Sequence, residues 1–217
     1  MIRYHRFCGR LCMLIFLIAG LACNDKSKHA IANDPTIQQI FTPEEINDLS
    51  AIITFFEQQI CDMLNVESDS ITDCYLHLLF NVASAQRTGV IYIPIQFEAQ
   101  QQMYSQLSPA AFTEIWLRGS GVNRETGAAL ERMTLSYDGK FMLFLESLKA
   151  DYPLLGAYHQ SFSEEHAITA VMIETFLYNY HLYNISDVRI RLLVALHHLT
   201  INDMYERKNA AFQSPGQ

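Results

Sequence analysis

The side chains best suited to chemistry are histidines near the C-terminus. Five of the eight histidines lie in the last 60 residues: His159, His166, His181, His197 and His198. Histidines and carboxylates clustered on helices can hold a metal ion, but neither His-Glu-X-X-His nor Glu-X-X-His occurs in this sequence. His197 recurs with Ile190 and Val194 along one helical face, so we interpret it as a hydrogen-bonded core histidine. The sequence therefore predicts no metal ion and no cofactor.

One carboxylate also stands in an apolar setting. Glu57 follows Phe55 and Phe56, and a carboxyl group beside apolar bulk can have a raised pKa and act as a general acid. A cell-wall glycosidase needs such an acid. Glu57 shares its helical face with Ser50 and Thr54, however, and we expect this polar face to be exposed to solvent. We assign no catalytic residue.

The only glycine-rich loop spans residues 118–127. Its backbone amides could bind an anion at the start of a helix, but the Gly-Lys-Ser/Thr of a phosphate-binding loop is missing. We expect a connection between two helices, with Arg124 and Glu125 paired at the surface. Ser161 and Ser163 lie near histidines without a nucleophile elbow, and we interpret them as turn and cap residues.

A group of late tyrosines offers a binding surface that needs no motif. Tyr158, Tyr178, Tyr180 and Tyr183 could line a groove for a sugar or a peptide. At helical spacing, most aromatic side chains instead belong to the core, with their hydroxyl groups hydrogen-bonded at its edge. Both interpretations stay open.

The first residues have the layout of an export signal. Residues 1–10 carry three arginines and no acid, and residues 11–21 carry no charge. An apolar stretch of this length is too short to cross a bilayer, which takes about 20 residues. It matches the apolar region of a signal peptide, and the chain turns polar directly after Cys23.

The run Leu21-Ala22-Cys23 resembles the lipobox of bacterial lipoproteins, although Gly20 stands where that family favours leucine. The resemblance covers only residues 1–23. It implies a signal peptide over residues 1–22, cleavage after Ala22, and lipidation of Cys23 by two or three acyl chains, which anchor a protein stably. The residue after Cys23 is Asn24 and not an aspartate, which favours the outer membrane as the location of the lipoprotein. The alternative is an ordinary secretory signal with an incidental cysteine.

Two cysteines remain for the folded domain once Cys8, Cys12 and Cys23 are accounted for. Cys61 lies four residues before the end of a predicted helix, and Cys74 lies four residues into the next. These positions face each other in an antiparallel helical hairpin, and an exported compartment permits disulfides. We predict a Cys61–Cys74 disulfide, with two buried free thiols as the alternative.

The remaining chain suits one acidic domain. Removal of the leader leaves 195 residues, with 12 basic against 23 acidic, a net charge of −11. Nucleic-acid binding needs a basic surface, so this composition argues against such a partner. It also argues against polybasic attachment to anionic lipid. We therefore expect the membrane to be contacted only through the lipid anchor.

Apolar periodicity predicts an all-α fold, a compact bundle of about seven to nine helices with one short extended segment. Residues 23–41, polar and aperiodic, are expected to be a flexible tether spanning roughly 23 Å. A single helical domain should cover residues 42–209, with a frayed tail over 210–217. The expected helices cover residues 42–65, 70–87, 97–107, 108–119, 128–135, 138–148, 154–162, 163–183 and 186–209, with the extended segment at 89–95.

The last expected helix is apolar nearly all round between Leu192 and Ile201, so it should lie at the centre of the bundle. Together these features predict a membrane-anchored lipoprotein of the bacterial cell envelope, on its periplasmic or surface face. Its activity is expected to be that of a binding or accessory module for an envelope protein or glycan. The alternative is a periplasmic cell-wall hydrolase or another envelope enzyme.

Overall fold

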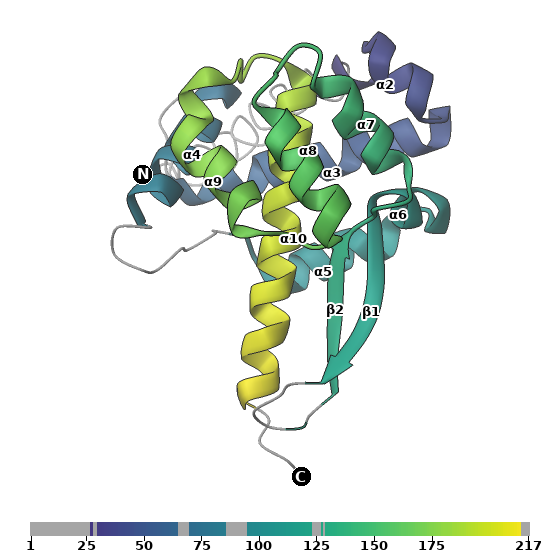
Figure 1. Cartoon of the computed structure of the whole chain (residues 1–217), viewed down its shortest axis with the longest axis vertical. Helices are drawn as coiled ribbons and strands as arrows, with labels where there is room; N and C mark the ends of the chain where they lie inside the picture. The colour runs from purple at the N-terminus through teal and green to yellow at the C-terminus, as the bar shows by residue number, and fades with distance from the viewer. Residues whose placement is uncertain are drawn as a thin grey trace, which may run out of the picture.

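Figure 1 shows the computed structural model of the chain, which describes residues 27, 30–64, 70–85, 95–122, 127 and 129–213. The fold is mostly helical, as predicted, and it also contains a small antiparallel sheet that was not expected. The elements are α2 (Pro35–Ile40), α3 (Pro43–Leu64), α4 (Ile71–Ala85), α5 (Phe97–Gln106), α6 (Pro109–Ile115), β1 (Trp116–Val122), β2 (Ala129–Leu135), α7 (Lys140–Leu148), α8 (Leu155–Glu165), α9 (Ala170–Asn179), the 3-10 helix η2 (Tyr180–Leu182) and α10 (Val188–Gln213).

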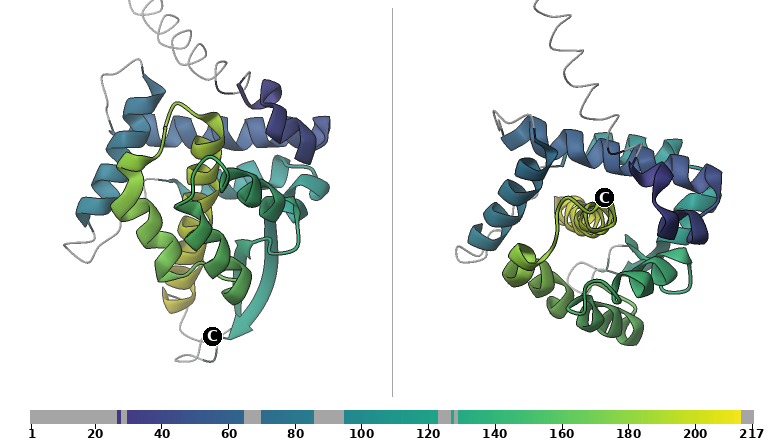
Figure 2. Two further views of the ribbon diagram at one scale, coloured as in Figure 1. Left: turned by 45° about the horizontal axis from the view of Figure 1, so that its top comes forward. Right: turned by 90° about the horizontal axis from the view of Figure 1, so that it is seen from above.

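Helix α10 forms the centre of the molecule. Every residue from Ile190 to Thr200 is buried, and the other helices surround α10 when the molecule is seen from above (Figure 2). A helix that is apolar all round can be stable only when neighbours cover every face. The predicted central position of the last helix is therefore confirmed. In the ranges described, no helix is both long and apolar enough to cross a bilayer.

The start of α3 has a capping box formed by Thr42 and Glu45. The Thr42 backbone N–H donates to Glu45 Oε2 at 2.7 Å, and the Glu45 N–H donates to Thr42 Oγ1 at 3.4 Å. Glu45 also pairs with Lys140 Nζ at 2.6 Å, which joins α3 to α7. These contacts lower the pKa of Glu45 against the opposing effect of desolvation. Local chemistry thus fixes one end of the longest helix before α10.

The expected tether was wrong over its second half. Asp34 caps α2 by accepting from the Ile37 N–H at 2.9 Å, and Pro35 occupies the first helical turn. Ile31 and Ile37 are fully buried and belong to the main core. The folded domain therefore begins by residue 30, because these apolar side chains pack on the bundle. Pro35 after an Asp cap was the signal of a helix start that the sequence analysis passed over.

A β-hairpin replaces a predicted loop and a predicted helix. Trp116 pairs with Leu135 and Val122 with Ala129 in the antiparallel register, and β2 packs against α10. Met133 and Leu135 are buried two residues apart, which is the spacing of a strand. Gly119 and Gly121 disfavour a helix. The helix expected at 108–119 therefore ends at Ile115, the one expected at 128–135 is a strand, and the first half of the loop assigned to 118–127 belongs to β1.

The late helices also differ from expectation at their ends. Helix α8 stops at Glu165 because His166 takes a left-handed conformation with a φ of 51°, and Thr169 then caps α9. One long helix over residues 163–183 was therefore wrong. Helix α10 continues to Gln213, past the expected fraying point after Asn209. Most of the extended segment expected at 89–95 lies outside the described residues, and Ile95 is buried.

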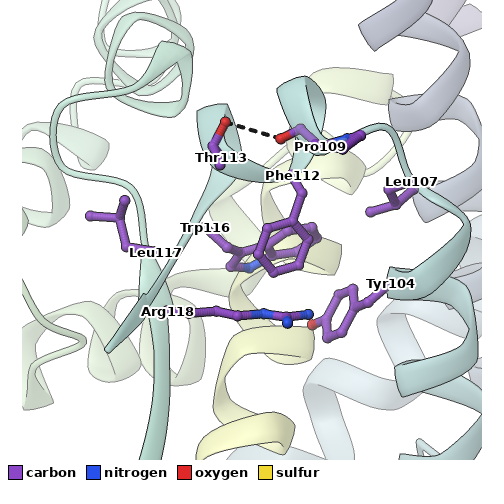
Figure 3. A pocket seen from close by; sticks show the side chains of 8 residues that line it. All are labelled: Tyr104, Leu107, Pro109, Phe112, Thr113, Trp116, Leu117 and Arg118. Carbon is purple, nitrogen blue, oxygen red and sulfur yellow. Dashed lines mark hydrogen bonds between the residues drawn. The ribbon is translucent and has the colours of Figure 1, made fainter. Parts of the chain in front are cut away.

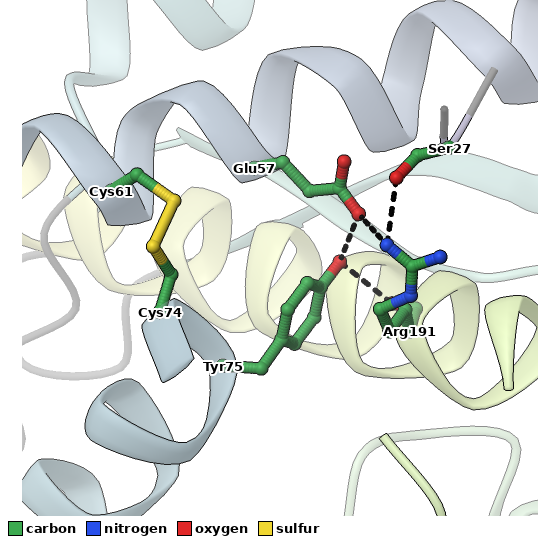
Figure 4. The surroundings of a disulfide bond; sticks show 6 residues. All are labelled: Ser27, Glu57, Cys61, Cys74, Tyr75 and Arg191. Carbon is green, nitrogen blue, oxygen red and sulfur yellow. Dashed lines mark hydrogen bonds and ion pairs between the residues drawn. A yellow bond between two sulfur atoms is a disulfide. The ribbon is translucent and has the colours of Figure 1, made fainter. Parts of the chain in front are cut away.

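The predicted disulfide is present. Cys61 of α3 and Cys74 of α4 are bonded, with their Cα atoms 5.2 Å apart (Figure 4). Replacing both by serine is expected to lower the free energy of unfolding by about 3 kcal/mol, since the bond restricts the unfolded chain. Urea denaturation of the double variant measures this loss. Dithiothreitol should shift the wild-type midpoint and leave the variant unchanged, and equal response of the two proteins would contradict the prediction.

Candidate binding pocket

A pocket of about 490 Å³ opens between α5, α6 and β1 (Figure 3). Its lining is mostly apolar and aromatic, with Tyr104, Leu107, Pro109, Phe112, Thr113, Trp116, Leu117 and Arg118. The Tyr104 and Trp116 ring centroids are 4.8 Å apart at 64°, and Phe112 lies 5.5 Å from Trp116. Three rings at these separations contact each other in the edge and tilted geometries that aromatic groups prefer.

Hydrogen bonds to neighbouring helices fix the two buried rings. The Trp116 indole Nε1–H donates to Thr200 Oγ1 of α10 at 2.9 Å. Gln100 Nε2 donates to the Tyr104 hydroxyl at 2.7 Å and to the Leu199 carbonyl at 2.7 Å. Burial raises the pKa of Tyr104 well above its ordinary value, so its hydroxyl stays neutral. The base of the pocket is consequently rigid, and its polar atoms are already engaged.

Arg118 supplies the charge at the pocket. Its Cζ lies 4.7 Å from the centroid of the Phe112 ring, a cation–π contact. Figure 3 shows the side chain extending from β1 across the pocket toward Tyr104. Within the described part of the chain, no carboxylate pairs with Arg118, and its N–H groups point to no protein acceptor. An anion at the mouth of the pocket therefore has a donor available.

Sequence reasoning did not find this pocket. Phe112 and Trp116 both fall within the helix expected over residues 108–119, whereas Trp116 is the first residue of β1. Trp116 is the only tryptophan of the chain and stands two residues before an arginine, which was the available signal. Its approach to Tyr104 depends on how α5 packs beside α10, and no local pattern encodes that packing.

Glu57 was expected at a solvated face, and this expectation was wrong. Its side chain is 3 % exposed, and Oε1 accepts from Arg191 Nη1 at 2.7 Å and from the Tyr75 hydroxyl at 3.4 Å (Figure 4). Arg191 Nη1 also donates to Ser27 Oγ at 2.7 Å. Desolvation raises the pKa of Glu57, although the Arg191 charge opposes this shift. The pair is enclosed by the bundle on one side and Ser27 on the other, so no substrate reaches it.

The late histidines are dispersed. His197 Nδ1 lies 3.0 Å from the Tyr158 hydroxyl in the core, which confirms its structural role. His159 pairs with Glu146, and His166 stacks on Tyr137 with centroids 4.3 Å apart. His181 lies against Tyr180. Among the described residues, no three histidines, cysteines or carboxylates gather in a metal-binding arrangement.

The tyrosine groove does not form. Tyr158 and Tyr183 are buried, at 0 % and 6 % exposure, and both contact the Phe176 ring. Tyr178 is exposed, at 58 %. Ser161 Oγ lies 2.6 Å from Thr169 Oγ1, and Ser163 donates to the His159 carbonyl, so both serines have structural partners. Arg124 and Glu125, the predicted surface pair, lie outside the described residues.

Comparison with known proteins finds no matching family model, no matching curated protein and no matching solved structure. The function must therefore be argued from the residues themselves.

Proposed function

We propose that this chain is a membrane-anchored lipoprotein of the bacterial cell envelope that binds a protein partner through the pocket around Trp116. The proposed localisation rests on the basic first ten residues, the uncharged stretch of residues 11–21 and the lipobox-like run ending at Cys23. The Cys61–Cys74 disulfide is consistent with an oxidising compartment.

The position of Ser27 against the folded domain supports attachment of the domain close to the membrane. Ser27 is 1 % exposed and is held by Arg191, near the start of α10. Cys23 precedes it by four residues, so a lipid on that cysteine lies at most about 14 Å from Ser27. The start of α10 would then face the membrane. The tip of the hairpin and the far end of α10 lie at the opposite end of the molecule (Figure 1).

The preformed pocket is the observation that carries the binding function. Ligand sites are usually concave, apolar and rigid, with few polar groups that set orientation. A glycan would need several polar contacts, but the Trp116 indole N–H and the Thr113 O–H already donate to protein acceptors, and the Tyr104 hydroxyl is buried and accepts from Gln100. Arg118 remains as the donor. This balance favours an apolar side chain of a protein over a sugar.

The hydrolase alternative loses its support. Its general acid was Glu57, which is ion-paired with Arg191 and covered by Ser27. A general acid must reach the proton acceptor of its substrate within hydrogen-bond distance. We therefore retain the binding module as the proposal.

The anchor is tested by Cys23→Ala. We expect the wild-type protein in the membrane fraction after a high-salt wash and the variant in the soluble fraction, because its acyl chains are missing. Labelling with radioactive palmitate should mark the wild type only. Retention of the variant in washed membranes would contradict the lipid anchor.

The docking site is tested by crosslinked capture from envelope membranes. Arg118→Glu should remove the captured partner, because it reverses the charge at the mouth of the pocket. Arg132→Glu is the matched control, since Arg132 is exposed and lies across the same hairpin from Gly119. A partner captured equally well by both variants would show that it binds elsewhere.

A further inference from the structure

We propose that the pocket takes the carboxyl terminus of a peptide that ends in a bulky apolar residue, with the side chain against Phe112 and the carboxylate on Arg118. This inference rests on the proposed function, in which the pocket is the docking site. It adds the chemical class of the bound segment and its orientation.

The apolar part follows from the walls. Leu107, Phe112 and Leu117 line the pocket, and Phe112 is half-buried next to the fully buried Trp116 ring. The volume of about 490 Å³ lies within the range of small-ligand sites. The polar atoms of Trp116 and Tyr104 point to Thr200 and Gln100. An occupant therefore gains by removing apolar surface from water.

The anionic part follows from Arg118. Arg189, Arg191 and Arg207 each pair with at least one carboxylate, whereas Arg118 pairs with none in the described ranges. Its guanidinium is stacked on Phe112 at 4.7 Å, which leaves the N–H groups along its edge available. This planar fork matches both oxygens of a carboxylate.

A chain terminus satisfies both requirements better than an internal acidic residue. Successive side chains of an extended peptide point to opposite faces, so an acidic neighbour of the inserted side chain points away from Arg118. The terminal carboxylate belongs to the inserted residue itself. It stays next to the inserted side chain, beside the exposed Arg118, which extends across the pocket and over the Phe112 ring (Figure 3).

Trp116 is the only tryptophan of the chain, and its ring centroid lies 5.5 Å from that of Phe112, so its fluorescence reports on binding at Phe112. We would titrate the mature lipidated protein, which begins at Cys23, in detergent with N-acetylphenylalanine and with its neutral amide, and follow tryptophan fluorescence. We expect a saturable change with the acid in the roughly millimolar range typical of so small a ligand. The amide should bind about tenfold more weakly, because it lacks the charge-assisted hydrogen bonds.

In the Arg118→Gln variant, N-acetylphenylalanine should bind only as weakly as its neutral amide. In the Arg132→Gln variant, the tenfold difference in affinity between the two ligands should remain. Acetyl-Phe-Asp-amide, with an internal acid, should bind like the neutral amide. The inference is overturned if neither probe changes the fluorescence, if acid and amide bind equally, or if the internal acid binds as well as the terminal one. Failure of the proposed function would appear separately, as membrane retention of Cys23→Ala or as capture that does not depend on Arg118.

Discussion

Replacing Arg191 with methionine is expected to lower the free energy of unfolding by about 3–5 kcal/mol. Arg191 and Glu57 have side-chain exposures of only 7 % and 3 %, and their pair is 2.7 Å long. The variant keeps a carboxylate in the core without its counter-charge, and desolvation then has no opposing guanidinium. Urea denaturation followed by circular dichroism measures the loss.

The control is the double variant Glu57→Met/Arg191→Met. Removing both charges should recover most of the stability lost in Arg191→Met, because a buried pair replaced by apolar residues of similar size is often neutral or stabilising. Within the part of the chain that the structure describes, Glu57 Oε2 and Arg191 Nε have no hydrogen-bond partner, so part of the cost of burying the pair is not offset. Arg132→Met, at an exposed position, should change stability by about 0.5 kcal/mol or less.

A double variant as unstable as the single variant would contradict this account. The deciding quantity is the coupling free energy between the two substitutions. It separates the contribution of the ion pair from that of the packing of the two apolar side-chain segments. Ser27→Ala should cost only about 1 kcal/mol, because Ser27 contributes one hydroxyl group to the network.

Local signals in the sequence predicted the elements that depend on local chemistry. The helix expected from residue 42 begins at the capping box of Thr42 and Glu45. Cys61 is bonded to Cys74 because both lie about one turn from the ends of consecutive helices. The central place of α10 followed from its apolar circumference. The helix start and the disulfide follow from residues that are near each other in sequence. The central position of α10 follows from its apolar composition, because such a helix must be shielded from solvent.

The elements that were missed depend on distant partners. Met133 and Leu135 alternate over too short a run to identify a strand before α10 is known to cover them. Glu57 appeared solvated because Arg191 is 134 residues away in the chain. The pocket has the same origin, since Thr200 orients Trp116 from α10. No periodicity within one segment carries this information.

The two buried histidines of α10 predict a loss of stability in mild acid. His197 contacts the Tyr158 hydroxyl and the Phe176 ring, and His198 Nδ1 lies 2.8 Å from the Val194 carbonyl. Burial lowers the pKa of His197 well below its ordinary value, with a smaller contribution from His198. Burial likewise lowers the pKa of His198 to about 4. Both imidazoles are therefore neutral in the folded protein.

The sign follows from proton binding. Between pH 6.5 and about 4 the unfolded chain takes up protons at these positions and the folded chain does not, so stability falls as the pH falls. Each histidine contributes up to about 1.4 kcal/mol per pH unit. Between pH 7 and 5 the pair should cost about 4 kcal/mol. Glu45 and Asp187, whose pKa values are lowered, lose their contributions only at lower pH.

Urea denaturation at a series of pH values separates this effect from the general cost of substitution. His197→Asn and His198→Asn should each reduce the slope of unfolding free energy against pH by about half, whatever their stability at pH 7. The raised pKa of Glu57 acts in the opposite direction above pH 4.5, but equally in every variant, so it cancels. His77→Gln, at an exposed position of α4, should keep the wild-type slope. A slope unchanged in both core variants would mean that the acid sensitivity arises elsewhere.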